Sequence, residues 1–376
     1  MMMLLVFIKA KSSGKIKSIR TIQNNNQLKK YILFYAIMIV GIPFSVNKGM
    51  SFNFVTNKFL PQVLYFLLFV SIITKKDDLE KILFCVCCSN FFYALFSLMN
   101  SGYIGGRFSF GSMFDANDLA HLFISQFPLA IYFLGEKQKT IKRIFAALTI
   151  GLSVVVSLMT GSRGGLIGLF AVAFILFFTP WSPLKMTQKL LVLVILIAAV
   201  LTNISKIDTD RFSSILNPKE DYNVTGEEGR LALWGRGITL TLSNPVTGVG
   251  VSCFPNAIGM LRLAEGGIRA RWQAPHNSYV EVLTEMGAFA FLVFIVMIVN
   301  ALRTFTRYAR SKRIESGSRS LEFMSQVMLL GFSGHLVTAF FLSLGYSLFF
   351  TLFFAFSLVL QNLCENSLGK GVETKR

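Results

Sequence analysis

A histidine in a short polar motif is the first candidate for chemistry in this chain. The motif Ala274-Pro-His276-Asn-Ser-Tyr279 closes a polar segment, residues 203–276, and opens a long apolar run. Histidine has the ordinary side-chain pKa closest to neutrality, so His276 is a candidate for proton transfer. The alternative is a histidine that caps or packs against its own helix, and one motif does not decide between them.

The second candidate is an arginine at the start of another apolar run. The motif Thr160-Gly-Ser-Arg-Gly-Gly165 directly precedes residues 166–179. An arginine at a helix amino terminus is unfavourable against the helix dipole unless an anion joins it. Backbone N–H groups, the Ser162 hydroxyl and the Arg163 guanidinium would together cradle an anion. An arginine that extends to lipid headgroups is an equally good interpretation.

Weaker polar candidates lie in or beside other apolar runs. Arg107 stands in a glycine-rich segment, and Asn117 or Asp118 is expected to cap the helix that follows it. His121 and His335 fall inside apolar runs, where each is expected to make an interhelical hydrogen bond rather than bind a ligand or relay a proton.

Two patterns that resemble binding motifs favour plainer interpretations. Asp208-Thr-Asp210 matches a pattern that holds divalent metals in nucleotide-sugar transferases, but three residues in a solvated segment match often by chance, and no metal site is predicted. Gly248-Val-Gly250 is expected to be a simple turn. The five cysteines imply no disulfide framework, since only Cys253 lies in the polar segment.

The elements that position these residues are membrane helices. Hydrophobic residues make up 53% of the 376 positions and charged residues only 15%, against about a quarter in a soluble protein. The fold class is therefore all-α, a polytopic membrane bundle of about ten helices with one large external loop that contains short helices. The ten predicted spans cover residues 31–47, 59–74, 82–99, 119–134, 144–160, 166–179, 189–202, 278–301, 322–343 and 346–363.

Lysine and arginine set the expected orientation of these spans. Connectors and tails on the amino-terminal side hold 25 of them and short connectors on the other side 4, which places both termini in the cytoplasm. The net charge of +18 is explained by this bias, and nucleic acid is not a predicted partner. The chain is thus divided into a basic tail (1–30), seven spans (31–202), an external loop (203–276), three spans (277–363) and a second cytoplasmic tail (364–376).

The external loop contains one amphipathic stretch, residues 228–242. Arg230, Trp234 and Arg236 alternate there with aliphatic side chains, and Trp234 is expected to rest on the membrane surface. The loop ends in Arg269-Ala-Arg271-Trp272, shortly before His276.

The ordered set of motifs resembles the O-antigen ligase and polysaccharide polymerase superfamily of bacterial membrane glycosyltransferases. The residues that carry the resemblance are Thr160 to Gly165, Arg230 with Trp234, Asn244 to Phe254, Pro275 to Tyr279 with Glu285 and Gly287, and more weakly Arg107 with Gly111 and Asn117. The resemblance implies transfer of a glycan from an undecaprenyl-diphosphate carrier to a sugar hydroxyl, on the outer face of the inner membrane, without metal, nucleotide or other cofactor.

The resemblance also implies roles for individual residues. His276 would be the base, and Arg163 and Arg230 would stabilise the departing diphosphate, supported by Arg269 and Arg271. Arg107, Ser162, Trp234 and Glu285 are the remaining predicted substrate-binding residues. The implied partners are the lipid-linked donor, a glycan or lipid-linked acceptor, membrane lipids, a chain-length regulator and a flippase.

Within this interpretation a polymerase is slightly favoured over a ligase. A polymerase joins repeat units, whereas a ligase moves finished glycan to another acceptor. The alternatives from other classes are a lipid-linked oligosaccharide flippase and a non-catalytic envelope assembly protein. The arginines lie at the outer edge and no internal repeat is visible, which argues against a transporter.

Overall fold

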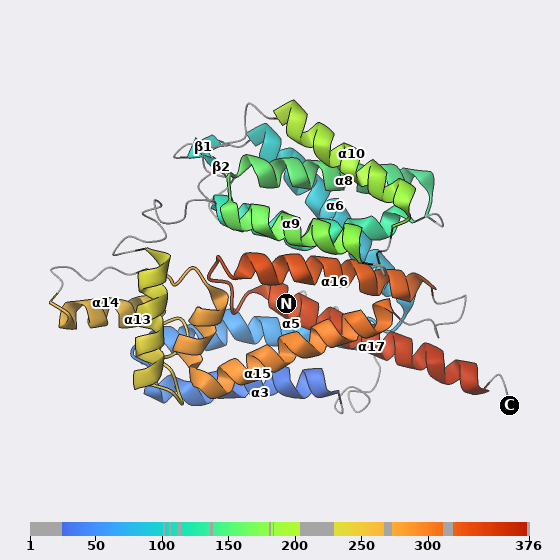
Figure 1. Cartoon of the computed structure of the whole chain (residues 1–376). Coiled ribbons are helices and arrows are strands. Elements are labelled where there is room, and N and C mark those ends of the chain that lie inside the picture. The colour runs from blue at the N-terminus through green and yellow to red at the C-terminus, as the bar shows by residue number, and fades with distance from the viewer. Residues whose placement is uncertain are drawn as a thin grey trace. The chain divides into compact units, whose positions relative to one another are not determined.

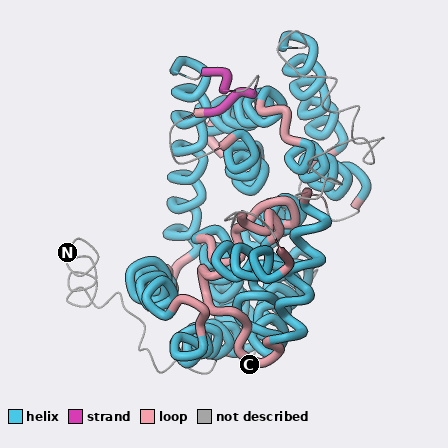
Figure 2. Tube along the Cα trace, turned by 90° about the vertical axis from the view of Figure 1, so that its left-hand side faces the viewer, coloured by secondary structure: helices cyan, strands magenta, loops and turns pink. Residues whose placement is uncertain are grey.

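The computed structural model describes residues 25–100, 102–104, 107–110, 115–135, 138–179, 182, 184–203, 229–266, 273–310 and 319–373. These residues are almost entirely helical, as Figure 1 shows. Where Figure 2 colours the trace, it is helix and loop apart from a two-stranded hairpin of β1 (Gly102–Ile104) and β2 (Arg107–Ser109), which the sequence did not predict.

Each predicted span coincides with a helix. The helices of these spans are α3 (Asn26–Gly41), α5 (Leu60–Ile72), α6 (Lys76–Asn100), α7 (Ala116–Ala130), α8 (Thr140–Met159), α9 (Arg163–Phe178), α10 (Met186–Asn203), α15 (Ser278–Ala309), α16 (Arg319–Ala339) and α17 (Leu348–Glu373). Among the described residues, six helical stretches are long and apolar enough to cross a membrane, namely Asn26–Phe44, Lys48–Ile72, Lys76–Asn100, Thr140–Met159, Ser278–Ala309 and Leu348–Ser367. A multi-pass helical protein is therefore confirmed, whereas the number of ten spans is not.

Side-chain caps explain where several helices begin. Asn47 accepts a hydrogen bond from the N–H of Met50, so helix α4 (Lys48–Asn53) starts well before the predicted second span. A π-helical segment (Phe54–Phe59) joins α4 to α5 just before Pro61, whose missing N–H interrupts the normal ladder. The predicted connector there is helical instead.

The cap of α7 differs from the prediction. Asp115, rather than Asn117 or Asp118, is the N-cap residue, and its carboxylate accepts hydrogen bonds of 2.7 Å and 2.9 Å from the backbone N–H groups of those two residues. Aspartate is as good a cap as asparagine, and the backbone of Asp115 is extended, as a cap requires.

The chain forms two compact units. One unit combines residues 1–74, 218–303 and 339–361, and the other combines 75–217, 304–338 and 362–376. The first unit holds α3, α4, α5 and most of α15, together with α13 (Arg230–Ser243) and α14 (Phe254–Ala264). These two short helices lie within residues 203–276, where short helices were predicted; that this stretch is external stays a prediction.

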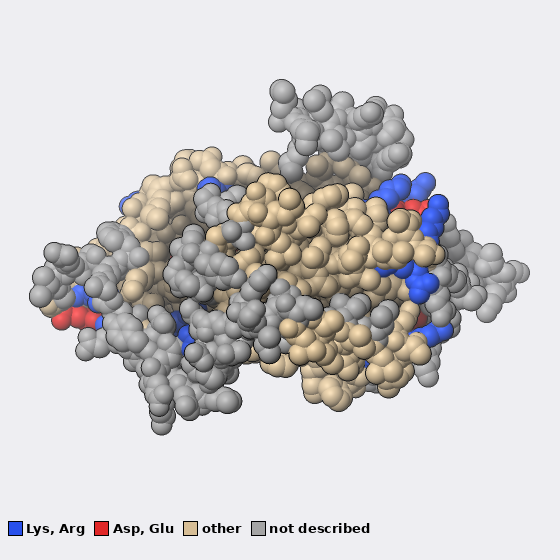
Figure 3. Space-filling view, turned by 90° about the horizontal axis from the view of Figure 1, so that it is seen from above, with Lys and Arg blue, Asp and Glu red and all other residues tan. Residues whose placement is uncertain are grey.

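The two ends of the second unit differ in character. Glu80, near the start of α6, binds Tyr132, Gln138 and Lys142, so the lysine-bearing starts of α6 and α8 meet at one end. Figure 3 shows Lys and Arg most densely at the right-hand end of the face it presents, with fewer at the left-hand end. The other end is an apolar cluster that joins the hairpin to α6, α7 and α8 through Ala94, Phe108, Leu119, Phe123, Val156 and Met159.

Candidate active site

The segment around His276 is held in place by hydrogen bonds between polar side chains and backbone groups. Asn277 is the cap of α15, since its side-chain oxygen accepts the N–H groups of Tyr279 and Val280 at 2.9 Å and 3.1 Å. The Ser278 hydroxyl donates to the carbonyl of Leu342 and accepts the N–H of Leu344. The start of α15 is therefore joined to the segment between α16 and α17.

His276 stands exposed on this support. Its φ of 48° lies in the left-handed region, which costs energy for a residue with a Cβ but is less unusual for histidine. The His276 N–H donates to the Ser343 hydroxyl at 2.9 Å, and this bond holds the strained backbone in place. Asn277 and Ser278 are buried, whereas His276 is exposed. The imidazole is therefore presented at the surface by a buried support.

Helix α13 is attached to the same segment through Trp234. The indole Nε1 donates a hydrogen bond of 2.8 Å to the carbonyl of Pro275, the residue before His276. The indole ring also packs edge-on against Phe340, with ring centroids 5.3 Å apart. Trp234 thus packs against the protein through its N–H and its ring, and the expectation that it rests on the membrane surface stays a prediction.

Arg230 shares a face of α13 with Trp234. The two residues are four positions apart, which places Arg230 one helical turn from the indole, on the side of the helix that meets the His276 segment. Arg230 is the first residue of α13 and is partly exposed. The structure therefore joins the helix that carries Arg230 and Trp234 to the residue before His276.

Helix α15 is kinked at Gly287, and residues 248–250 pack against the kink. Gly287 interrupts the helix with φ 77° and ψ 176°, which releases the carbonyls of Thr284 and Glu285 from the helical ladder. The N–H groups of Val249 and Gly250 donate to these two carbonyls at 3.0 Å and 2.9 Å. A Cβ on Gly248 would collide with the Glu285 carbonyl, so this position needs glycine for close approach. The segment that was predicted as a simple turn therefore packs tightly against α15.

Glu285 joins residues 252–254 to the kinked part of α15. It is 2% exposed, and its two carboxylate oxygens accept the N–H groups of Ser252 and Phe254 at 2.8 Å and 2.9 Å. A carboxylate with two backbone donors forms strong, charge-assisted hydrogen bonds. Glu281 likewise accepts the N–H of Gly345 at 2.8 Å. In this structure both glutamates bind backbone; that Glu285 contacts substrate stays a prediction.

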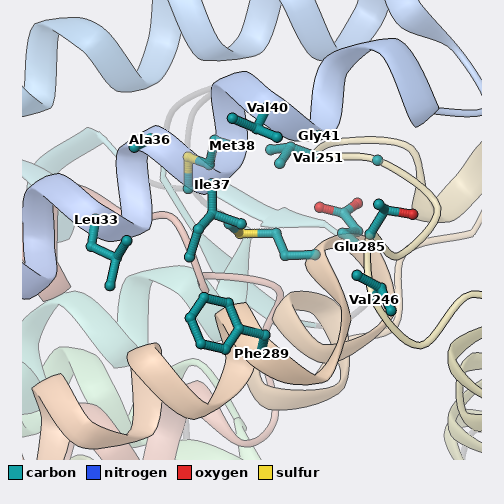
Figure 4. A pocket seen from close by; sticks show the side chains of 13 residues that line it. Leu33, Ala36, Ile37, Met38, Val40, Gly41, Val246, Val251, Glu285 and Phe289 are labelled. Atoms are coloured by element: carbon teal, nitrogen blue, oxygen red, sulfur yellow. The ribbon is translucent and has the colours of Figure 1, made fainter.

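An apolar pocket of about 360 Å³ adjoins Glu285 (Figure 4). Its walls are α3, the turn after α13 and the kinked part of α15, and the lining side chains include Leu33, Ile37, Val246, Met286 and Phe289. Apart from Glu285 and Thr247, the side chains around it are apolar, so it suits a hydrocarbon chain rather than a sugar.

The second unit holds two predicted arginines, Arg107 and Arg163. Ser162 is buried and caps α9 by accepting the N–H of Gly165 at 3.1 Å, and Arg163 is the first residue of that helix. The predicted cradle therefore starts at a true helix amino terminus, where the Ser162 hydroxyl is already used as the cap. Arg107 pairs with Ile104 in the hairpin, whose Phe108 packs on α7 and α8, so the Arg107 strand lies at an end of these helices.

The two remaining histidines form a buried pair in the second unit. Nδ1 of His121 shares a hydrogen bond of 2.6 Å with the Thr338 hydroxyl, and Nδ1 of His335 lies 3.3 Å from Nε2 of His121. Both side chains are at most 1% exposed. The prediction of interhelical hydrogen bonding, here between α7 and α16, is confirmed.

Two residues that support the site were not predicted, and several predicted residues lie outside the described part of the chain. Arg269, Arg271 and the pattern Asp208-Thr-Asp210 lie outside the described residues, as does residue range 1–24. The sequence interpretation missed Ser343, which it placed at the end of the span 322–343, and Gly345, which lies between that span and the next. The sequence feature that could have indicated them is the presence of Ser343, Gly345 and Ser347 in an otherwise apolar stretch.

The fold is that of a multi-pass helical membrane protein, and the stretch between α10 and α15 carries Arg230 and His276. Residues 145–295 match a family model described as O-antigen ligase. The matched stretch contains Arg163, Arg230, Trp234, His276 and Glu285. The chain is thus similar over this stretch to the O-antigen ligase family, and the resemblance inferred from its motifs is confirmed. No curated protein matches the chain.

Proposed function

We propose that this protein is a glycosyltransferase that moves a glycan from an undecaprenyl-diphosphate carrier to a sugar hydroxyl during synthesis of a cell-surface polysaccharide. The family match supports a ligase or polymerase of this general type. The observation that carries the proposal is the hydrogen bond from Trp234 to the Pro275 carbonyl, since it ties the Arg230-bearing helix to the His276 segment.

The reaction needs a base for the acceptor and a cation for the leaving group. The acceptor oxygen attacks the anomeric carbon while its proton passes to the imidazole of His276. The bond between the anomeric carbon and the diphosphate oxygen breaks, and the electron pair stays on the diphosphate, where the Arg230 guanidinium stabilises the charge. The imidazolium then returns its proton to water, which restores the base.

The exposed position of His276 fits this role. A base that serves a large glycan acceptor must be reachable from water, and the side chain stands outside a buried, hydrogen-bonded support. The apolar pocket beside Glu285 is the candidate place for part of the carrier's hydrocarbon chain. Arg163 is assigned to the diphosphate by its motif and its place at the start of α9.

We place the protein in the bacterial inner membrane with both termini in the cytoplasm and the loop outside. The support is the lysine and arginine bias of the connectors. Single reporter fusions after Lys76, in the external loop and after Lys312 test this orientation. A loop reporter that is active only in the cytoplasm would contradict the proposal.

The test of function is transfer by the purified protein in nanodiscs, with lipid-linked glycan extracted from a host strain that lacks the gene. Arg230→Ala is expected to slow transfer about 10²–10³-fold, by analogy with removing one donor that stabilises transition-state charge. Arg236→Ala is the matched control, because Arg236 lies on the same helix but pairs with Glu265 at 3.4 Å. Equal rates for the two variants would remove Arg230 from the site.

The products separate the remaining alternatives. Longer glycan formed from donor alone indicates a polymerase, and transfer that requires an added lipid or protein acceptor indicates a ligase. Polymerase is the outcome we expect. Movement of intact donor across a vesicle membrane, with no new glycosidic bond, would show a flippase and overturn the proposal.

Arg163 is tested in the same assay against Arg143. Arg163→Ala is expected to lower transfer by a similar factor of about 10²–10³. Arg143 lies in the first turn of α8, at the lysine-rich end of its unit, and Arg143→Ala is expected to leave the rate unchanged. An unchanged rate in Arg163→Ala, with normal protein yield, would contradict its assignment.

A further inference from the structure

Helix α13 carries an exposed apolar stripe that the site does not use. Leu231, Ile238 and Leu242 are 52%, 51% and 76% exposed. They are separated by seven and four residues, so they lie along one side of the helix. Exposed aliphatic side chains are ordinary when scattered, but a continuous row of them indicates a surface that is covered by something.

The helix has three different faces. Leu233, Gly237 and Thr241 form the buried face, where Gly237 touches Val280 and Thr284 of α15. A second face consists of polar or small residues that remain accessible, with Arg236, Thr239 and Ser243. The apolar stripe lies between these two faces.

Three faces of this kind are what a helix at a membrane surface needs. One side packs on the protein, one meets hydrocarbon and one meets water and headgroups. A helix that is covered only by water has no reason to keep an apolar row beside its polar one. The direction of α13 agrees with this position, since it runs across α3, α5 and α15 in Figure 1 rather than along them.

The stripe continues onto α15, which is long and apolar enough to span a membrane. The turn after α13 carries Val246, which is 73% exposed, and the preceding Pro245 accepts a hydrogen bond of 2.8 Å from Ala288 of α15. Just beyond the kink, Phe289 and Leu292 are 56% and 59% exposed. The exposed apolar surface of α15 therefore passes through Val246 to Leu242 on α13.

We infer that α13 lies in the outer boundary of the bilayer, with the stripe of Leu231, Ile238 and Leu242 in contact with lipid chains. The partner is the lipid surface, and the contact is made by side chains other than Trp234. The inference depends on the faces of α13 and their continuity with α15, and it would hold whether or not the protein transfers glycans.

The test places one environment-sensitive fluorescent amino acid at a single site in the full chain. The protein is reconstituted in phosphatidylethanolamine and phosphatidylglycerol vesicles, with and without brominated acyl chains. Probes at Leu231, Ile238 and Leu242 are expected to emit at shorter wavelength and to lose at least half their emission to brominated lipid. Probes at Thr239 and Ser243 are the matched controls, and iodide in water is expected to quench them instead.

Each outcome decides the inference. Equal quenching of stripe and control probes by iodide would overturn it. Stripe probes that are shielded in native membranes yet quenched by iodide in the vesicles would show a protein partner in place of lipid, and would overturn it as well. All three stripe positions are exposed, so a poorly folded variant at one of them leaves two others that decide the question.

Discussion

His276 and the pair of His121 and His335 use the same side chain in opposite surroundings. His276 is exposed on a left-handed turn, and its segment is held by hydrogen bonds between backbone groups and serine hydroxyls. His121 and His335 are buried, and they bond to each other and to Thr338. One setting makes an imidazole available to an acceptor, whereas the other uses it to join two helices.

The difference shows that surroundings, rather than residue type, separate a candidate base from a structural histidine. A buried hydrogen-bonded pair stabilises α7 against α16, and its removal should affect folding. An exposed histidine on a strained turn contributes little to packing, and the surrounding structure must hold the strain. The predictions below therefore separate stability from rate.

The largest effect is expected from the glycine turn that packs against the kinked part of α15. Gly248 has φ 64°, and an added Cβ would meet the Glu285 carbonyl. Gly248→Ala should cost roughly 2–5 kcal/mol in stability, from left-handed backbone and overpacking together. The measurement is the thermal midpoint and the yield of monodisperse protein. Gly235→Ala is the control, because nothing lies within 4 Å of its added Cβ, and a similar loss there would undermine the explanation.

A smaller loss of stability is expected at the buried pair. His121→Ala removes the partner of Thr338 and His335 and should cost about 1–3 kcal/mol, since it leaves a buried polar group without its bond. The transfer rate per folded molecule should not change. The comparison fails if this variant folds normally but no longer transfers glycan, because the pair would then belong to the chemistry.

The smallest effect is expected at the indole bond. Trp234→Phe keeps an aromatic ring near Phe340 but loses the hydrogen bond to the Pro275 carbonyl. The loss should be about 0.5–1.5 kcal/mol, the usual net value of one such bond. Transfer should fall up to about tenfold, which corresponds to 1.4 kcal/mol, because Arg230 is then held less firmly. A fully active variant would show that this bond does not position the site.

Apolar runs were enough to predict where the helices are, but not where they begin. Residues 48–58 contain a lysine at each end and a glycine, and they were interpreted as a connector, yet Asn47 caps a helix there. Likewise Asp115 caps α7 in place of the two polar residues that follow it. Caps are decided by a single backbone conformation, which a sequence pattern does not contain.

The site was predictable as far as its residue types carried information. His276 was found because it directly precedes a long apolar run, and Arg230 and Trp234 because they lie in an amphipathic stretch whose spacing resembles a known family. Which face met the protein was not predictable, because helical periodicity groups residues without naming their partner. The contributions of Ser343 and Gly345 were missed for a related reason, since they act through a hydroxyl and a backbone N–H.

The most direct test of the central claim is the transfer rate of His276→Asn in nanodiscs. Asparagine accepts the left-handed backbone at this position more readily than alanine, so the support is preserved while the base is removed. The account predicts a loss of about 10²–10⁴-fold in rate with an unchanged thermal midpoint, the usual contribution of a general base. A rate within threefold of the wild type would contradict it.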